Sequence, residues 1–567
     1  MTGGAALAVA GLSSIPTIAV ASADPGGQHG YGPATATPIK HLVVIFQENV
    51  SFDHYFGTYP RAANLAGENP FHAAPGTPTV NGLSAALLRA NPNMSNPQRL
   101  TPAQALTCDQ DHGYVAEQNA FDHGLMDHFV QSTGHRVGLS ACLAAVGNKA
   151  PVAGSSPDYA VMDYFDGNTV TGLWNYAQHF AMSDNSYGTT MGPSTPGALN
   201  VAVGNTYGAI CGPARAVINA PSCSAATPPP PTPGSVAPAG AGTDYNDADP
   251  LYDACSDNAT NGGAYTASAD IAMGGANIGD LLDRSGVTWG WFQGGFSSPG
   301  YVPGRPTTDN LADVCTATHR NVGGATVTDY IPHHEPFQYF ASTANPRHLP
   351  PTSVAMIGRQ DQANHQYALR DFWAAADSGN LPAVSYLKAP AYQDGHAGYS
   401  DPTDEQHFLV DTINRLEKLP SWGSTAVVIN YDDSDGWYDH QMGPVLTQSQ
   451  SSLDTLSGTN QCGTDPAAVP MTDAGTPEQG RCGVGPRLPM MVISPWAKRN
   501  FVDNSFTDQT SVVRFVEDNW LGGQRIGDGN GDAMAGSLDT MFDFSRPAAP
   551  RLFLDPATGE PFAGDRA

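Results

Sequence analysis

The sequence predicts an α/β protein built on a mostly parallel sheet. Four short apolar runs are expected to form buried strands: His41–Phe46, Ala383–Leu387, Ala426–Asn430 and Leu488–Ser494. Their apolar character is continuous, which favours parallel strands that are covered on both faces. Two segments, Asp404–Leu419 and Thr510–Leu521, repeat apolar residues at close to a helical period. Strands that alternate with helices are typical of an α/β sheet.

The bulk composition indicates a loop-rich globular protein. Of the 567 residues, 62 are Gly and 47 are Pro, while 40% are hydrophobic and only 14% are charged. Disorder is not expected, because it needs low hydrophobicity together with high charge. The formal net charge of -28 repels nucleic acids and anionic bilayers at long range. We therefore expect no nucleic-acid partner, and an anionic substrate would need local cations or a metal ion.

The first 38 residues are expected to be a leader and linker. Two apolar runs, Ala5–Leu12 and Ile15–Ala21, lead into an A-x-A cleavage pattern at Ala21–Ala23. This is typical of a secretory signal peptide, although no basic residue precedes the apolar runs. Either the true start lies upstream or the segment is only a tail of small residues. We expect a soluble, secreted or periplasmic protein, since no other stretch reaches the roughly 20 apolar residues of a transmembrane helix.

The eight cysteines point to the same compartment. Their number is even and none forms a C-x-x-C pair, so disulfides are favoured over metal binding. Pairing of nearest neighbours would give Cys108–Cys142, Cys211–Cys223, Cys255–Cys315 and Cys462–Cys482. The sequence does not fix this connectivity, and buried free thiols are the alternative.

The chain is expected to form one main domain over residues 39–545. The segment 214–242 is Pro-rich and can be neither helix nor central strand. It is interpreted as a surface insertion, because the polar motifs lie on both sides of it. Residues 546–567 are expected to be a surface tail.

Two acidic sites directly follow predicted strands. Glu48 and Asn49 come after the first strand, and Asp432 and Asp433 come shortly after the third. The carboxyl ends of parallel strands meet at one edge of a sheet, where ligands bind. Adjacent carboxylates repel each other, and a divalent cation removes that cost. Helix capping by Asn49 or Ser51, and an ordinary acidic turn at Asp432, are the alternatives.

A hydroxyl lies on a rigid turn at Gly192–Gly197, where Ser194 stands between two prolines. Such a turn can present a side chain at the start of a helix. Alone, this string is more often a plain turn.

Taken together, four segments resemble the bacterial phosphoesterase family of acid phosphatases and phospholipases C. They are Glu48–Gly57, Gly192–Pro196, Tyr431–His440 and Gly485–Pro489. They occur in the family's order between about Ile39 and Leu521. The resemblance implies an alkaline-phosphatase-like fold, with a central, mostly parallel sheet sandwiched by helices and long loop insertions. It also implies that residues 39–545 are a catalytic domain.

The resemblance also implies roles for individual residues. Ser194 matches the nucleophile. The matching ligands of one divalent metal ion are Glu48, Asn49, Asp432, Asp433 and the Ser194 oxygen. Histidines near the phosphate are matched by His112, His333 or His334, and His396. Hard oxygen ligands favour Ca²⁺, Mg²⁺ or Mn²⁺ over Zn²⁺.

The expected activity is hydrolysis of a phosphoric ester through a phosphoseryl intermediate, as in acid phosphatases. The metal would favour the serine alkoxide, and histidines would stabilise the phosphoryl oxygens and protonate the leaving group. The substrate is then a small phosphate ester or a phospholipid headgroup. A phospholipase C is the main alternative, and a non-catalytic secreted protein that binds metal or glycan is a remote one.

Three positions depart from the family pattern. Gly197 stands where Asn is common, and Gln509 stands where His is common. Asp433 replaces a longer Glu, which shortens one metal ligand. Gly197 and Gln509 place substrate contacts in doubt.

Two further features are ambiguous. Gly527–Asp532 resembles a calcium loop but lacks its full pattern. Trp289–Phe296 could line a substrate mouth or pack in the core.

Overall fold

A computed structural model of the chain describes Met1 and residues 34–134, 160–211, 230–256, 270–304, 314–547 and 549–562. Several predictions lie wholly or partly outside these residues. They include the leader 1–38, most of the Pro-rich insertion, the pairings that involve Cys142 and Cys223, and parts of the tail 546–567. The described residues from Ala34 onward belong to one unit.

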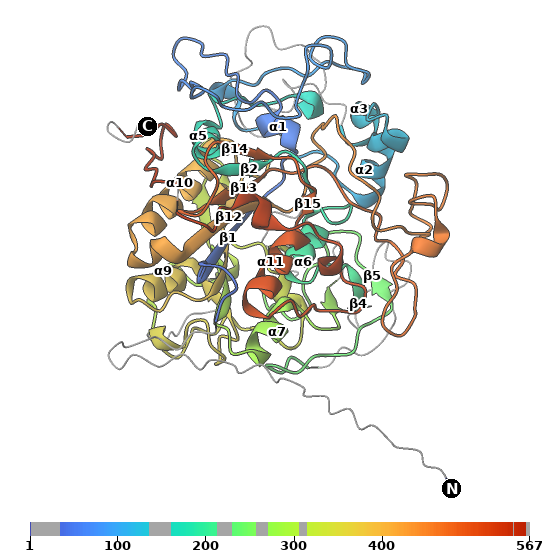
Figure 1. Cartoon of the computed structure of the whole chain (residues 1–567), viewed down its shortest axis with the longest axis vertical. Helices are drawn as coiled ribbons and strands as arrows, with labels where there is room; N and C mark the ends of the chain where they lie inside the picture. Colours follow the sequence, from blue (N-terminus) through green and yellow to red (C-terminus); the bar gives the residue numbers. More distant parts are fainter. Residues whose placement is uncertain are drawn as a thin grey trace. The chain divides into compact units, whose positions relative to one another are not determined.

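An eight-stranded sheet forms the centre of this unit, in the order β10-β7-β11-β1-β12-β13-β2-β14 (Figure 1). Its strands are β1 (His41–Gln47), β2 (Ala181–Ser183), β7 (Trp289–Gln293), β10 (Gln366–Ala368), β11 (Val384–Lys388), β12 (Thr425–Tyr431), β13 (Met490–Ile493) and β14 (Phe501–Asp503). Seven of them run in one direction. The predicted α/β class with a mostly parallel sheet is confirmed.

The central strands are buried on both faces. In β1, Leu42 pairs with Val384 of β11 on one side and with Ala426 of β12 on the other. Side chains from Leu42 to Phe46 are fully buried. This burial explains why the run is continuously apolar, since neither face of the strand meets water.

The direction of the fourth predicted strand was wrong. Leu488–Ser494 contains β13, which is antiparallel to both β12 and β2. Met490 and Ile493 are as buried as the residues of the parallel strands. A continuous apolar run therefore reports that both faces are covered, and it carries no information about strand direction.

Helices cover both faces of the sheet. In Figure 1, α9 (Leu369–Asp377) and α10 (Pro402–Lys418) lie on one side of the central strands, whereas α6 (Ser194–Ala202) and α11 (Thr510–Trp520) lie on the other. The two predicted helices are therefore confirmed as α10 and α11. The side chain of Asp401 caps α10 by accepting from the backbone N–H groups of Thr403 and Asp404.

Smaller elements complete the described structure. The helices are α1 (Phe52–Phe56), α2 (Tyr114–Phe121), α3 (Phe129–Ser132), α5 (Thr171–His179) and α7 (Ile278–Arg284). The strands are β3 (Ser186–Tyr187), β4 (Tyr207–Cys211), β5 (Gly242–Thr243), β6 (Ile271–Met273), β8 (Thr318–Arg320), β9 (Thr326–Thr328) and β15 (Thr507–Asp508). In the part of the chain that the structure describes, no helix combines the length and the apolar character needed to span a bilayer.

The C-terminal segment is integrated into the fold, which corrects the expectation of a surface tail. Leu552 and Leu554 are buried in the main core. The Leu552 N–H donates to Glu417 of α10 at 2.9 Å, and Asn414 of the same helix donates to the Leu554 carbonyl at 2.7 Å. The segment that contains Leu552 and Leu554 therefore packs against α10.

The aromatic stretch packs in the core. Trp289, Trp291 and Phe292 belong to β7 and are fully buried within the main hydrophobic cluster. Core packing is thus the correct interpretation, and these rings do not form a substrate mouth.

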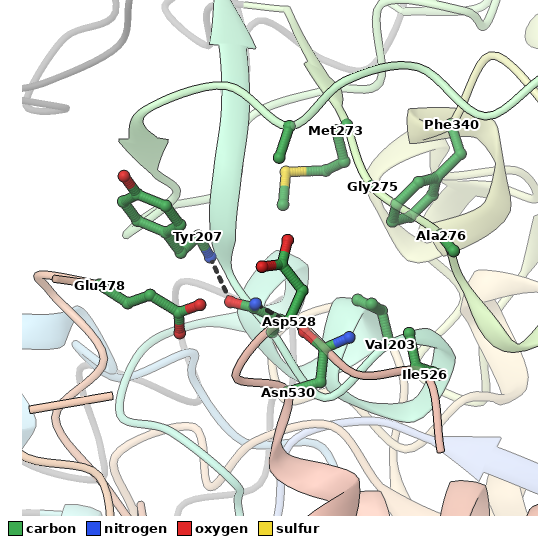
Figure 2. A pocket seen from close by; sticks show the side chains of 13 residues that line it. Val203, Tyr207, Met273, Gly275, Ala276, Phe340, Glu478, Ile526, Asp528 and Asn530 are labelled. Atoms are coloured by element: carbon green, nitrogen blue, oxygen red, sulfur yellow. Dashed lines mark hydrogen bonds between the residues drawn. The ribbon is translucent and has the colours of Figure 1, made fainter. Parts of the chain in front are cut away.

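The Gly/Asp-rich loop is held by hydrogen bonds. Asp532 accepts from the N–H groups of Ile526 and Ala533 at 2.8 Å each, and Asp528 accepts from the Asp473 N–H at 2.7 Å. Figure 2 shows Asp528 in the wall of a pocket of about 40 Å³, which Val203 at the end of α6 also lines. A space of that size holds a few water molecules.

Two of the expected disulfides are present among the described residues. Cys255 pairs with Cys315, and Cys462 pairs with Cys482. Each closes a separate loop, and the second pair spans a sequence separation of 20.

We predict that the double variant Cys462→Ala/Cys482→Ala unfolds more easily than the wild type. Loss of a closed loop of this length costs about 3 kcal/mol in the loop-entropy model. Denaturant titration of both proteins without reductant measures the difference. With reductant present, the two proteins should become more alike. Equal unfolding free energies without reductant would contradict a stabilising role.

Candidate functional site

The two acidic sites meet at one edge of the sheet. β1 and β12 are adjacent and parallel, and their last paired residues are Gln47 and Tyr431. The chain then continues as the β1 segment (residues 48–53) and the β12 segment (residues 432–440). The Asn49 N–H donates to Asp432 Oδ1 at 3.2 Å, and the Asp432 N–H donates to the Gln47 carbonyl at 3.1 Å.

Ser194 lies between these two segments. It is the first residue of α6, and Pro193 precedes it in extended conformation. The Ser194 hydroxyl is 3.2 Å from Glu48 Oε2 and 3.1 Å from Asp433 Oδ2. The side chain of Asp433 therefore reaches the serine, although it is shorter than the Glu that is common at this position of the family. The structure brings together the hydroxyl and the two acidic sites that the sequence separates widely.

The turn before Ser194 is fixed by an acidic residue that sequence reasoning missed. Gly192 has a φ of 119°, a conformation that favours glycine. Its N–H donates to Glu117 Oε2 at 2.8 Å, and the other carboxyl oxygen of Glu117 accepts from the Ser434 hydroxyl at 3.0 Å. Glu117 thus links the serine turn to the β12 segment. Burial raises the pKa of Glu117 to about 8.

The residues at this edge fit a divalent cation. Asn49 Oδ1 and Asp432 Oδ2 are buried and have no hydrogen-bond partner among the described residues. An oxygen acceptor that lacks a partner is costly to bury, and an ion would satisfy it. Glu48, Asn49, Asp432, Asp433 and Ser194 offer only oxygen donors, which is the chemistry of a site for a hard cation.

A lysine also reaches this centre, although the sequence analysis did not identify it. Lys388 ends β11, the strand next to β1, and its buried ammonium group contacts Glu48 Oε1. Burial lowers the pKa of Lys388, although nearby carboxylates, including Asp432, oppose this shift. The sequence shows only that a lysine directly follows the predicted strand Ala383–Leu387, and the contact with Glu48 depends on the pairing of β11 with β1.

The predicted histidines surround the same space. His334 Nδ1 lies 3.1 Å from Glu48 Oε1, and the rings of His333 and His334 are 4.5 Å apart. The rings of His112 and His396 are 6.2 Å apart. His112 Nδ1 lies 3.3 Å from Asp435 Oδ1, and the Asp435 N–H donates to Asp433 Oδ1 at 2.6 Å. The histidine pairs thus adjoin both acidic segments.

The pKa values of the histidines are shifted in opposite directions. Burial opposes the charge on His112, yet Asp433 and Asp435 raise its pKa well above the usual value. Burial, together with His333 and His396, lowers the pKa of His334. The surrounding charges therefore favour the protonated form of His112, whereas burial and the neighbouring imidazoles disfavour the protonated form of His334.

Of the groups of side chains whose ligand atoms lie within 4.8 Å of one another in the described residues, two adjoin the serine. One comprises Glu48, His334 and Asp394; the other comprises Asp109, His112, His396 and Asp435. The centre therefore offers nitrogen as well as oxygen donors.

The departures at Gly197 and Gln509 converge on the backbone of Asp432. A Cβ on Gly197 would stand 2.2 Å from the Asp432 carbonyl oxygen. The buried side-chain amide of Gln509 contacts the same oxygen and donates to the Tyr431 carbonyl at 3.0 Å. Both residues thus position the β12 segment, which explains their identity without a substrate contact.

Comparison with known proteins assigns the class. The chain matches the phosphoesterase family over residues 39–521. Because this match covers most of the chain, the protein belongs to the phosphoesterase family, as the four motifs predicted.

Similar individual proteins are named phospholipases C. The non-hemolytic phospholipase C of Pseudomonas aeruginosa is 32% identical over 179 residues, which cover 30% of this chain and 24% of the relative. Phospholipase C B of Mycobacterium tuberculosis is 21% identical over 548 residues, which cover 92% of this chain and 81% of the relative. Non-specific phospholipase C6 of Arabidopsis thaliana is 28% identical over 152 residues and 24% of each chain. The Pseudomonas match thus spans about a quarter of that relative.

We predict that Gly197→Ala destabilises the protein, because the added methyl group collides with the Asp432 backbone. Overpacking of this kind costs about 1–3 kcal/mol, measured by denaturant titration. Gly423→Ala is the matched control, since a Cβ there meets open space. If both variants unfold at the same denaturant concentration, α6 does not depend on this close approach.

Proposed function

We propose that this protein hydrolyses phosphoric esters, with Ser194 as the nucleophile. The observation that carries the proposal is the Ser194 hydroxyl, 3.2 Å from Glu48 and 3.1 Å from Asp433, where the two acidic segments meet. A serine hydroxyl is a weak nucleophile unless its proton is removed or its oxygen is coordinated. Carboxylates on both sides supply acceptors for that proton.

We propose that the acidic residues around Ser194 bind a metal ion and that Lys388 balances part of their charge. Glu48, Asn49, Asp432 and Asp433, with the Ser194 oxygen, would hold one divalent ion, for which Ca²⁺, Mg²⁺ or Mn²⁺ suits the oxygen donors better than Zn²⁺. When bound, such an ion stabilises negative charge on oxygen. Lys388 balances part of the negative charge of Glu48.

The reaction divides into two steps. Ser194 Oγ forms a bond to phosphorus while the ester P–O bond breaks, and the alcohol leaves with a proton. His112 is the proposed donor, because its pKa is raised and the imidazolium is held by Asp435. Water then forms a bond to phosphorus while the bond between phosphorus and Ser194 Oγ breaks, one proton of the water returns to the serine, and the phosphate product leaves. His333, His334 and His396 are proposed to contact the phosphoryl oxygens.

Two substrate classes fit this chemistry. A phosphomonoester is our first candidate, since Ser194 matches the nucleophile of the acid phosphatases. A phospholipid is the second candidate, favoured by the phospholipase C names of relatives that match almost the whole chain. The aromatic stretch gives no additional support to the lipid, because Trp289, Trp291 and Phe292 are buried in β7 and Phe296 is buried in a separate hydrophobic cluster.

The disulfides also support a secreted or periplasmic location, because such bonds persist in oxidising compartments. We propose that the leader over residues 1–38 directs export.

We predict that Ser194→Ala abolishes turnover of p-nitrophenyl phosphate while the thermal unfolding temperature stays close to that of the wild type. Loss of a nucleophile that acts as part of a unit lowers the rate by several orders of magnitude. Thr195→Ala is the matched control, because Thr195 faces Tyr339 and the Ala248 carbonyl, and it should retain most activity. Near-wild-type turnover by Ser194→Ala would overturn the covalent mechanism.

We predict faster turnover of p-nitrophenyl phosphate than of phosphatidylcholine in parallel assays of the wild-type protein. The two assays should run on the same preparation, with metal content measured before and after chelation. If only the lipid is cleaved, the protein is a phospholipase C. Cleavage of neither substrate at full metal loading would favour a non-catalytic binding protein.

A further inference from the structure

Four ionisable residues of the family motifs form a cluster apart from the serine, and three of them are buried while His440 is partly buried. Arg487, which precedes β13, is fully buried. Its guanidinium Nη2 lies 3.1 Å from Asp53 Oδ1, and its Nε donates to Asp439 Oδ2 at 3.1 Å. His440 Nδ1 lies 2.6 Å from Asp53 Oδ2. We call Asp53, Asp439, His440 and Arg487 the arginine cluster.

The two carboxylates of the arginine cluster also cross-link the backbone. Asp53 ends the β1 segment, and its N–H donates to Asp439 Oδ2 at 3.1 Å. Asp439 lies near the end of the β12 segment, where the His440 N–H donates to Asp53 Oδ2 at 2.9 Å. Each carboxylate therefore accepts from the backbone of the other segment.

Arg487 is anchored on every side. Its Nη1 donates to the carbonyls of Asn81 at 2.7 Å and Asp184 at 3.0 Å. Its own carbonyl accepts from the Phe52 N–H at 2.8 Å, and its guanidinium lies 4.4 Å from the Phe52 ring centre. This arrangement uses the planar fork of arginine, which lysine cannot reproduce.

Between the cluster and the site, hydrogen bonds join the two segments along their length. The Val50 N–H donates to the Asp433 carbonyl at 3.0 Å, and the Ser51 hydroxyl donates to the Tyr438 carbonyl at 2.8 Å. One end of each segment is thus fixed by the pairing of β1 with β12, and the other end by the arginine cluster.

From this geometry we infer that Arg487 is a positioning residue that sets the metal affinity of the site. It holds the β1 and β12 segments at the separation that Glu48 and Asn49 need to share an ion with Asp432 and Asp433. The guanidinium contacts Asp53, Asp439 and the carbonyls of Asn81 and Asp184, none of which belongs to the proposed ligand set. The inference rests on the proposed metal site, and it adds a residue outside the ligand set that determines metal affinity.

Arg487 can position the two segments because its guanidinium is positively charged and is long enough to contact both Asp53 and Asp439. Without the guanidinium, Asp53 and Asp439 would face each other as buried carboxylates with too little positive charge, which is strongly unfavourable. The segments would separate to admit water, or one carboxyl group would bind a proton and lose an acceptor. Either change loosens the ligands, because they lie on the same two short segments.

The test measures metal binding directly. Chelator-treated protein is titrated calorimetrically with CaCl2, MgCl2 and MnCl2 in separate experiments, using wild type, Arg487→Lys and Asp439→Asn. Outer partners of metal ligands typically contribute about 10- to 100-fold in affinity. We expect a loss of that size in Arg487→Lys and a smaller loss in Asp439→Asn, whose side chain keeps one acceptor oxygen.

Arg481→Lys is the matched control. Arg481 is also fully buried and pairs with Glu478, but its other partners are the carbonyls of Gly204 and Gly529, away from both segments. It should lower the unfolding temperature while leaving the metal dissociation constant within about twofold of wild type.

The outcomes are distinct. If the wild type binds an ion and Arg487→Lys binds it equally well, the inference is wrong and the proposed site stands. If Arg481→Lys weakens binding as much as Arg487→Lys, the effect is general destabilisation and the inference is also wrong. If the wild type binds none of the three ions, both the inference and the proposed metal site fail. If Arg487→Lys does not fold, Asp439→Asn carries the comparison.

Discussion

The parallel pairing of β1 with β12 is the constraint on which the candidate site depends. The register carries through Gln47 and Tyr431, so the next residues of both strands leave the sheet side by side. The acidic residues that follow β1 and β12 thereby become neighbours, although they are far apart in the sequence. A change of register by one residue would turn the ligands of one strand away from those of the other. The sheet therefore sets the relative placement of the two acidic segments.

Nearby cationic and hydrogen-bonding side chains offset the repulsion between the buried carboxylates of the site. The chain as a whole is strongly acidic, and the carboxylates of Glu48, Asp432 and Asp433 lie close together in a region of low solvent access. Lys388 on β11 and the histidines around the serine supply positive charge or hydrogen bonds at short range. A similar balance recurs beyond the site, where Arg487 separates two buried aspartates. The protein thus concentrates its scarce buried cations where carboxylates gather.

The sequence could predict the features that each lie within one short segment. Apolar runs identified the four strands, and residue identity at their ends identified Glu48, Asn49, Asp432 and Asp433. Features that arise only from contacts between distant segments escaped prediction. Glu117 and Lys388 carry no local motif, and the antiparallel direction of β13 leaves no trace in its apolar pattern. Gly197 and Gln509 were recognised as unusual, but their shared contact with Asp432 depends on how α6 and α11 pack against β12.

The place of β1 in the sheet has a consequence for the order in which the molecule can assemble. β1 is made early during synthesis, yet its partners are β11 at Val384–Lys388 and β12 at Thr425–Tyr431. Pairings of such long range are slow to form, because much chain entropy is lost before any contact is gained. Until those strands emerge, the apolar run from His41 to Phe46 has no surface to cover it. A nascent chain of this design must keep its central strand away from other chains, and transport in the unfolded state is compatible with that delay.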